Sequence, residues 1–158
     1  MKITITLKMS ELIYDIQNTS YLTGRSLNNG SNHSHVANMQ ANDDEENVSQ
    51  ILRSITMAYS LLRNRLAEYM EGGGATASNT LLSAEDNIEL SLEMPSNFNG
   101  NATQTLVDAA HQFIVATAIA DWFAITAKGE TADYTVMAEG SLRIIEESLC
   151  KRIRPSRN

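Results

Sequence analysis

Length, composition and charge place this chain among acidic globular proteins. It has 158 residues, of which 42% are hydrophobic and 20% charged, and a net charge of −7, which suits one packed domain and excludes a disordered chain. The last eight residues hold four cations and no acid, so they carry +4 and leave −11 for residues 1–150. Such an acidic body argues against general nucleic-acid binding.

Cysteine content and hydropathy narrow the class further. The single cysteine, Cys150, excludes an internal disulfide framework and fits a reducing compartment. The first residues alternate between apolar and polar side chains, so we expect no secretory signal. The longest apolar stretch, residues 106–127, is interrupted by four polar side chains, and we therefore expect a buried central helix and no membrane span.

The chain begins with a predicted strand and helix. Residues 2–9 alternate between apolar and polar side chains, with Ile3 and Ile5 on the apolar face, which is the pattern of a half-buried strand. Ser10 offers an N-cap to a helix whose apolar spacing continues to about Leu27.

A polar segment then precedes the best-patterned helix. Residues 28–43 are rich in turn-forming side chains, and we expect them to form a flexible surface loop. The second helix begins near Asp43, and an apolar side chain recurs every three or four residues along it. The glycines at 72–74 are expected to end this helix.

A second alternating segment, residues 87–94, predicts another strand, with Ile88 and Leu90 on its apolar face. The outward residues are basic in the first strand and acidic in this one, so we predict that the two strands pair, with Lys–Glu pairs across them. Two strands alone are marginal in water. The sheet must pack on a helix, or its edge must pair, through Ile3, Ile5, Ile88 and Leu90, with a strand of another subunit.

Two further helices follow. A capping box, Asn101 with Gln104, starts the third helix, which ends before Gly129. The fourth helix starts at about Thr131, and Pro155 stops it. Because the connection at Gly129 is short, we expect these two helices to form an antiparallel hairpin.

These elements predict an α+β fold that is mainly helical, with four helices, two of them long, and a two-stranded sheet. We expect one domain over residues 1–158, with the flexible loop 28–43 and a short basic arm at residues 155–158. Trp122 and Phe123 are expected to fill its core.

One charged residue interrupts the apolar helix. Asp121 lies directly before Trp122. A carboxylate in this place can cap a helix, pair with a basic side chain of the next helix, or face an interface, and the sequence leaves all three open.

No motif carries a complete catalytic or metal-binding set. His111 lies three residues after Asp108, so the two share a helix face and can orient a general base, but no nucleophile accompanies them and we expect a hydrogen-bonded structural histidine. His33 and His35 lack a third ligand, and the glycine-rich residues 71–76 lack the lysine of a phosphate-binding loop. We predict a protein that is not an enzyme and uses no metal and no cofactor.

Two charged segments are candidate partner sites. The acidic run at the start of the second helix complements the helix dipole, and we keep open that it contacts a basic neighbour. The cations of the C-terminal tail complement the end of the last helix, except for the one beyond Pro155, which that helix does not need. The candidate contact residues are Asp43, Asp44, Glu45, Glu46, Lys151, Arg152, Arg154 and Arg157.

Much of the chain, apart from the N-terminal strand and the Asn-rich loop, resembles small head–tail connector (neck or adaptor) proteins of tailed bacteriophages and prophages. The resemblance rests on the helix after "MPSNFNGNATQTL", the apolar "HQFIVATAIADWFAI" and the closing "YTVMAEGSLRIIEESLCKRIRP". The matching positions are Ala120-Asp121-Trp122, Ala138-Glu139 with Leu142, and Lys151 to Pro155.

This resemblance implies a non-enzymatic virion part. Such proteins assemble as a homo-oligomeric ring between the portal protein and other neck or tail proteins, around a channel through which DNA passes without sequence-specific binding. The implied location is the virion neck, after assembly in the cytoplasm of a bacterial host, with no membrane partner. The basic tail would then reach a neighbouring subunit, the portal or phosphates in the channel.

Two other classes of function fit the residues. A small cytoplasmic regulatory or DNA-binding protein would use the basic tail to contact phosphates. An enzyme would use His111 with Asp108, and it would need a well-formed pocket around them.

Overall fold

A computed structural model describes residues 1–72 and 76–157. Its strands and helices, in chain order, are β1 (Lys2–Leu7), α1 (Met9–Ser26), α2 (His33–Met39), α3 (Glu45–Arg65), β2 (Ile88–Glu93), α4 (Thr103–Thr126) and α5 (Thr131–Leu149). Short 3₁₀ turns occupy Ala67–Tyr69, Gly100–Ala102 and Lys128–Glu130. The protein is therefore α+β and mainly helical, with a two-stranded sheet. Its described part holds five α-helices, where the sequence predicted four.

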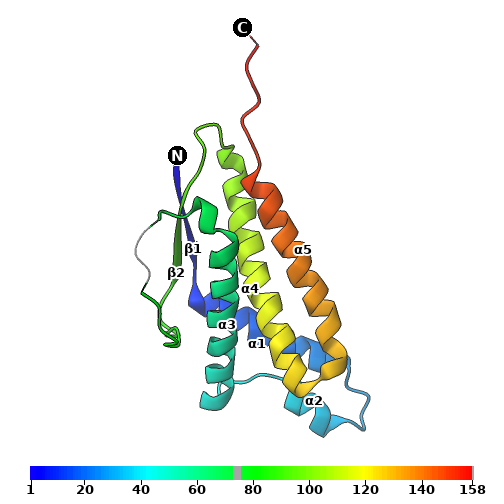
Figure 1. Ribbon diagram of the computed structural model, residues 1–158. Helices are drawn as coiled ribbons and strands as arrows, with labels where there is room; N and C mark the ends of the chain where they lie inside the picture. The colour runs from blue at the N-terminus through cyan, green and yellow to red at the C-terminus, as the bar shows by residue number, and fades with distance from the viewer. Residues whose placement is uncertain (73–75, 158) are drawn as a thin grey trace.

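The long apolar helix α4 lies at the centre of the molecule (Figure 1). It packs against α5, α3, α1 and β1, and Phe123 is fully buried while Trp122 is 6% exposed. α4 is also long and apolar enough to cross a membrane, yet 61% of its most apolar window is buried within the protein. This packing against four elements confirms the prediction of a largely buried central helix.

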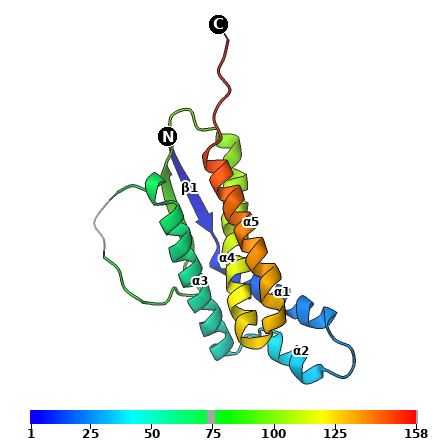
Figure 2. The ribbon, with the colours of Figure 1, turned by 45° about the vertical axis from the view of Figure 1, so that its right-hand side comes forward.

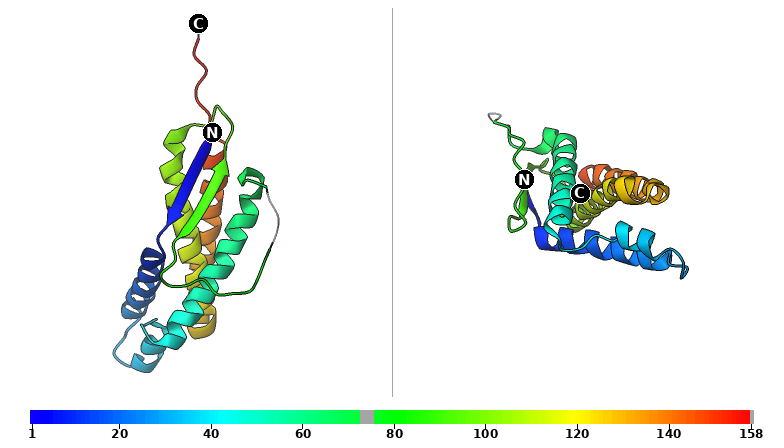
Figure 3. Two further views of the ribbon diagram at one scale, coloured as in Figure 1. Left: turned by 90° about the vertical axis from the view of Figure 1, so that its left-hand side faces the viewer. Right: turned by 90° about the horizontal axis from the view of Figure 1, so that it is seen from below.

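The two strands pair as predicted. β1 and β2 are antiparallel, and the register places Ile3 opposite Leu92 and Ile5 opposite Leu90. The apolar faces are buried and lie over α4, while the polar faces meet solvent (Figure 3, left). The expected pairing of Lys2 with an acid across the strands is wrong in detail. Lys2 lies opposite Glu93, but its Nζ lies 3.1 Å from a carboxylate oxygen of Glu71, outside the strand.

A helix replaces part of the loop predicted over residues 28–43. α2 buries Val36 and Met39, and the indole Nε1 of Trp122 donates a hydrogen bond of 2.8 Å to the Met39 carbonyl. The side chain of Ser20 accepts another from the backbone N–H of Ala41, at 3.0 Å. Contacts with α4 and α1 therefore order residues 33–41. Two apolar residues three positions apart are enough to hold one short helix when both pack into the core.

Several helix ends lie where local signals did not put them. α1 begins at Met9 after Lys8, so Ser10 is inside the helix. α3 ends at Arg65, well before Gly72, and the remaining predicted terminators, residues 73 and 74, lie outside the described residues. The capping box is also wrong, because the side chain of Asn99 accepts the hydrogen bond from the Asn101 N–H and caps a 3₁₀ turn before α4.

α4 and α5 run side by side in opposite directions (Figures 1 and 2). The turn Lys128–Glu130 joins them. α5 starts at Thr131 as predicted. The end of α5 differs from the prediction and shapes the basic tail described below.

Candidate functional site

The basic tail leaves the body as an extended segment. α5 ends at Leu149, where the sequence predicted a helix that continues to residue 154. Past that end the backbone pairs with residues 97–99: the Asn99 N–H donates to the Lys151 carbonyl at 3.1 Å, and the Ile153 N–H donates to the Asn97 carbonyl at 2.8 Å. Long-range backbone pairing therefore ends the helix, and Pro155 plays no part in stopping it.

The four cations of the tail have different surroundings. Arg152 uses Nη1 to donate to the Leu149 carbonyl at 2.8 Å, so it caps the end of α5, as predicted for cations in this place. Lys151, Arg154 and Arg157 are exposed, and within residues 1–72 and 76–157 no carboxylate pairs with them. The tail thus carries three exposed cations without a carboxylate partner among the described residues, and its end projects beyond the body (Figures 1 and 2).

The acidic run lies at the opposite end of the molecule (Figure 1). Asp43, Asp44, Glu45 and Glu46 are all exposed at the start of α3. Glu45 and Glu46 line a shallow hollow of about 580 Å³ with Arg53. The structure therefore does not bring the predicted acidic and basic contact residues together within one chain.

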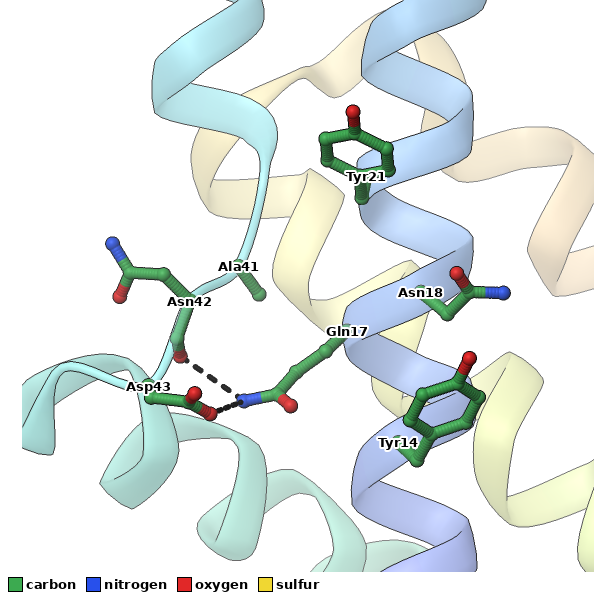
Figure 4. A pocket seen from close by; sticks show the side chains of 7 residues that line it. All are labelled: Tyr14, Gln17, Asn18, Tyr21, Ala41, Asn42 and Asp43. Atoms are coloured by element: carbon green, nitrogen blue, oxygen red, sulfur yellow. Dashed lines mark hydrogen bonds between the residues drawn. The ribbon is translucent and has the colours of Figure 1, made fainter.

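Asp43 also borders a second hollow, which Figure 4 shows from close by. The hollow measures about 250 Å³ and lies between α1 and the segment before α3. The amide Nε2 of Gln17 donates to the Asn42 carbonyl at 3.1 Å and to Oδ1 of Asp43 at 3.0 Å. Tyr14 and Tyr21, one on each side, are 62% and 50% exposed. Exposed tyrosines are enriched in protein interfaces.

The predicted sheet-edge residues lie on the buried face of the sheet. Ile3, Ile5, Ile88 and Leu90 are each at most 7% exposed, so a further strand would meet the backbone of the edge rather than these side chains. The outer edge of β2 already receives Met70, which forms a bridge with Leu92. In the part of the chain that the structure describes, no bridge occupies the outer edge of β1.

His111 has a structural partner from another helix. Its Nε2 lies 2.6 Å from Oδ2 of Asp15 on α1, and the two side chains are 24% and 42% exposed. Asp108 accepts instead from the amide of Gln104 at 3.0 Å. The expectation of a hydrogen-bonded histidine is confirmed, but the carboxylate partner is Asp15, which sequence spacing does not reveal.

A groove runs between α4 and α5 and measures about 240 Å³. Small side chains lie between its two helices, and two carboxylates border it. We call this the α4–α5 groove. Its lining residues are Phe113, Thr117, Ala120 and Asp121 of α4 and Thr135, Ala138, Glu139 and Leu142 of α5.

Asp121 is the electrostatic anomaly of this groove. Burial of its carboxyl raises the pKa of Asp121 above the ordinary value, and a hydrogen bond with the side chain of Ser54 lowers it in part. The Asp121 residue as a whole is nevertheless exposed, whereas Ser54 is 3% exposed. No basic side chain pairs with Asp121 within the described ranges. Of the three roles left open by the sequence, pairing with a basic side chain of the next helix is ruled out.

α3 flanks the groove. Leu61 lies seven residues after Ser54 and four before Arg65, so all three share one helix face. Ser54 contacts Asp121, and Nη1 of Arg65 lies 3.2 Å from Glu146 of α5, so this face looks toward α4 and α5. Leu61 nevertheless remains 55% exposed. One apolar side chain on this face of α3 is thus left exposed.

The protein is thus a mainly helical α+β chain with exposed aromatic, apolar and charged side chains on several of its faces. Within residues 1–72 and 76–157, no group of three metal-ligating side chains comes together. Comparisons with protein-family models, with curated proteins and with solved structures found no match to the chain.

Proposed function

We propose that the protein is a structural subunit of the neck of a tailed bacteriophage or prophage. In this role it assembles with further copies as a ring between the portal protein and other neck or tail proteins, in the cytoplasm of a bacterial host, and stays in the virion neck. DNA passes through the ring without sequence-specific contacts. The protein acts by assembly and carries out no chemical reaction.

The observation that carries this proposal is the basic arm. Its base is held to the body by two backbone hydrogen bonds, from Asn99 to Lys151 and from Ile153 to Asn97, while Arg154 and Arg157 project without a partner among the described residues. An arm that is anchored at its base and unpaired at its tip suits contact with another subunit. It does not stabilise its own chain beyond Ile153.

The remaining surfaces support an assembling subunit. The outer edge of β1 has no bridge in the described residues, and an open edge is a site for strand addition. Tyr14 and Tyr21 are exposed on α1, and Met57 and Leu61 on α3. Unsatisfied backbone and apolar groups on different faces suit a subunit that has neighbours on more than one side.

Mass spectrometry of purified virions tests the proposal. We expect peptides of this protein in the particle, in an amount comparable with that of the portal protein. After the capsid and the tail are separated at the neck, we expect the protein in one of these two fractions. A protein that is made during infection but is missing from purified particles would rule out a neck subunit.

A second candidate function, DNA binding by the arm, is favoured by the same exposed cations. Counterion release gives a binding constant that falls with salt, with a slope of about −0.9 for each phosphate neutralised. The arm offers few cations against a body of net charge −11. Electrophoretic mobility shifts at low salt, with the full chain and with residues 151–158 removed, distinguish the two functions, because only a DNA-binding protein loses a shift when the arm is removed.

A further inference from the structure

We propose that the α4–α5 groove is the docking site for the basic arm of a second copy of this chain. In the bound state, Arg154 or Arg157 of the donor lies along the apolar floor of the groove and places its guanidinium against Asp121 and Glu139. This inference deepens the proposed function, because it names the contact between neighbouring subunits.

Charge complementarity identifies the occupant. Asp121 and Glu139 both border the groove, and neither has a cationic partner in the described part of the chain. The arm holds the opposite charges, also without partners. Arginine forms the best-matched contacts with carboxylates, since its planar fork presents several N–H donors at once.

The size and lining of the groove fit one long side chain. At about 240 Å³ it is smaller than the roughly 300–1,000 Å³ typical of small-molecule pockets. Phe113 and Leu142 supply apolar surface, and Ala120 and Ala138 leave room beside them. The methylene stem of an arginine buries against such a surface while its head stays near the carboxylates.

The environment of Asp121 supports the same contact. Its carboxyl loses part of its hydration in the free protein, and a hydroxyl of Ser54 is its hydrogen-bond partner. A guanidinium placed beside it would favour the ionised form, since a nearby opposite charge lowers the pKa of an acid.

The arm is directed away from the groove of its own chain. Residues 151–153 are tied to residues 97–99, so only Arg154–Arg157 are free to move within the described arm. The groove lies along α4 and α5, whereas the arm leaves beyond the end of α5 and points away from the body (Figure 1). The proposed acceptor is therefore another copy, displaced along the long axis of the donor.

Disulfide trapping between two full-length variants tests this contact. Both carry Cys150→Ser, which removes the native thiol. One adds Ser156→Cys in the arm and the other adds Thr135→Cys in the groove, and isotope labelling of one variant identifies the mixed disulfide by mass spectrometry. These cysteines leave all arm cations and both groove carboxylates in place.

Matched acceptors give the controls. Ser10→Cys on α1 is exposed and lies outside the groove, and Ser49→Cys lines the acidic hollow at the start of α3. We expect the Thr135→Cys acceptor to give at least about a fivefold higher yield of mixed disulfide than either control, in keeping with a coupling of roughly 1 kcal/mol or more. Equal yields for all three acceptors, or a preference for Ser49→Cys, would overturn the groove as the docking site.

Charge removal gives a second readout. Asp121→Asn with Glu139→Gln in the acceptor is expected to reduce the yield to the level of the Ser10→Cys control. Asp133→Asn with Glu147→Gln removes the same net charge from exposed positions of α5 outside the groove and should leave the yield unchanged. If both double variants reduce the yield equally, only the general acidity of the body attracts the arm, and the specific site is wrong.

The outcome is separable from that of the proposed function. If the protein is found in virions but the arm shows no preference for Thr135→Cys, the proposed neck function is supported and the proposed docking site is rejected. If trapping succeeds but the protein is missing from virions, the contact between copies stands and the neck assignment falls.

Discussion

The polar side chains on two sides of the central helix α4 differ in the partners that they have. On the side of α1, His111 lies 2.6 Å from the carboxylate of Asp15, and Leu12 and Ile16 of α1 are fully buried. On the side of α5 and α3, Asp121 has only the hydroxyl of Ser54 as a partner, and Leu61 is left exposed. The polar side chain on the first side is paired within the chain, whereas Asp121 on the second side has no cationic partner among the described residues.

Truncation in the core is expected to give the largest difference between the sides. Ile16→Ala on α1 removes a fully buried side chain and should lower the free energy of unfolding by about 2–5 kcal/mol. Leu61→Ala on the uncovered side should change it by less than about 0.5 kcal/mol. Urea denaturation of both variants measures this, and similar losses would mean that Leu61 is packed in solution.

Loss of the Trp122 hydrogen bond is the next largest effect. Trp122→Phe leaves the Met39 carbonyl without its donor, and a buried unpaired acceptor costs about 1–3 kcal/mol. Hydrogen exchange should increase mainly in residues 33–39, because this bond joins α2 to α4. An increase spread evenly over all helices would show that α2 does not depend on this bond.

The His111–Asp15 pair should contribute less, since Asp15 is 42% exposed. Asp15→Asn is expected to lower stability by no more than about 1 kcal/mol. Asp108→Asn is the matched control, because Asp108 contacts only the surface amide of Gln104 and should have no measurable effect. Thermal unfolding of the two variants at the same pH compares them. A larger loss of stability from Asp108→Asn than from Asp15→Asn would show that Asp108, and not Asp15, is the partner of His111.

Asp121→Asn should have the smallest effect, and of the opposite sign. Burial raises the pKa of Asp121 in the folded protein, so the folded state holds this proton more tightly than the unfolded chain. The stability that comes from this proton is full below the unfolded pKa and is lost as the pH rises through the folded pKa. The variant, which cannot ionise, should be slightly more stable than the native protein at pH 7.

The difference between Asp121→Asn and the native protein should vanish in acid. Below the ordinary aspartate pKa, both chains are neutral at this position, and unfolding curves should coincide. Addition of a partner that supplies an arginine would reverse the neutral-pH gain, since the native carboxylate would then be paired. A variant that is less stable at pH 7 without a partner would contradict the burial of this carboxyl.

The elements that sequence predicted well are those with an uninterrupted local pattern. The alternation in residues 2–9 and 87–94 matches the burial of Ile5 and Leu90 in a paired sheet. The apolar content of α4 likewise indicates its central place. These patterns repeat over several turns or pleats, so one exception does not obscure them.

The elements that sequence missed depend on contacts between distant residues. α2 offers only Val36 and Met39 to the core, and its position depends on Trp122, more than eighty residues away. The end of α5 depends on pairing with residues 97–99. The candidate groove also depends on distant residues. A charged residue within an apolar helix marks Asp121 as unusual in the sequence, but only the structure shows that Ser54 and Glu139 lie near it and that no cation pairs with it in the described residues.

The pairing of residues 151–153 with residues 97–99 has an entropic consequence. Fixing the backbone of one residue costs about 1–2 kcal/mol. A tail that was free from Lys151 onward would lose the freedom of all its residues on docking, whereas here folding has already ordered the first three. Because three residues are ordered in advance, docking of the tip would cost roughly 3–6 kcal/mol less than docking of a tail that was free from Lys151 onward.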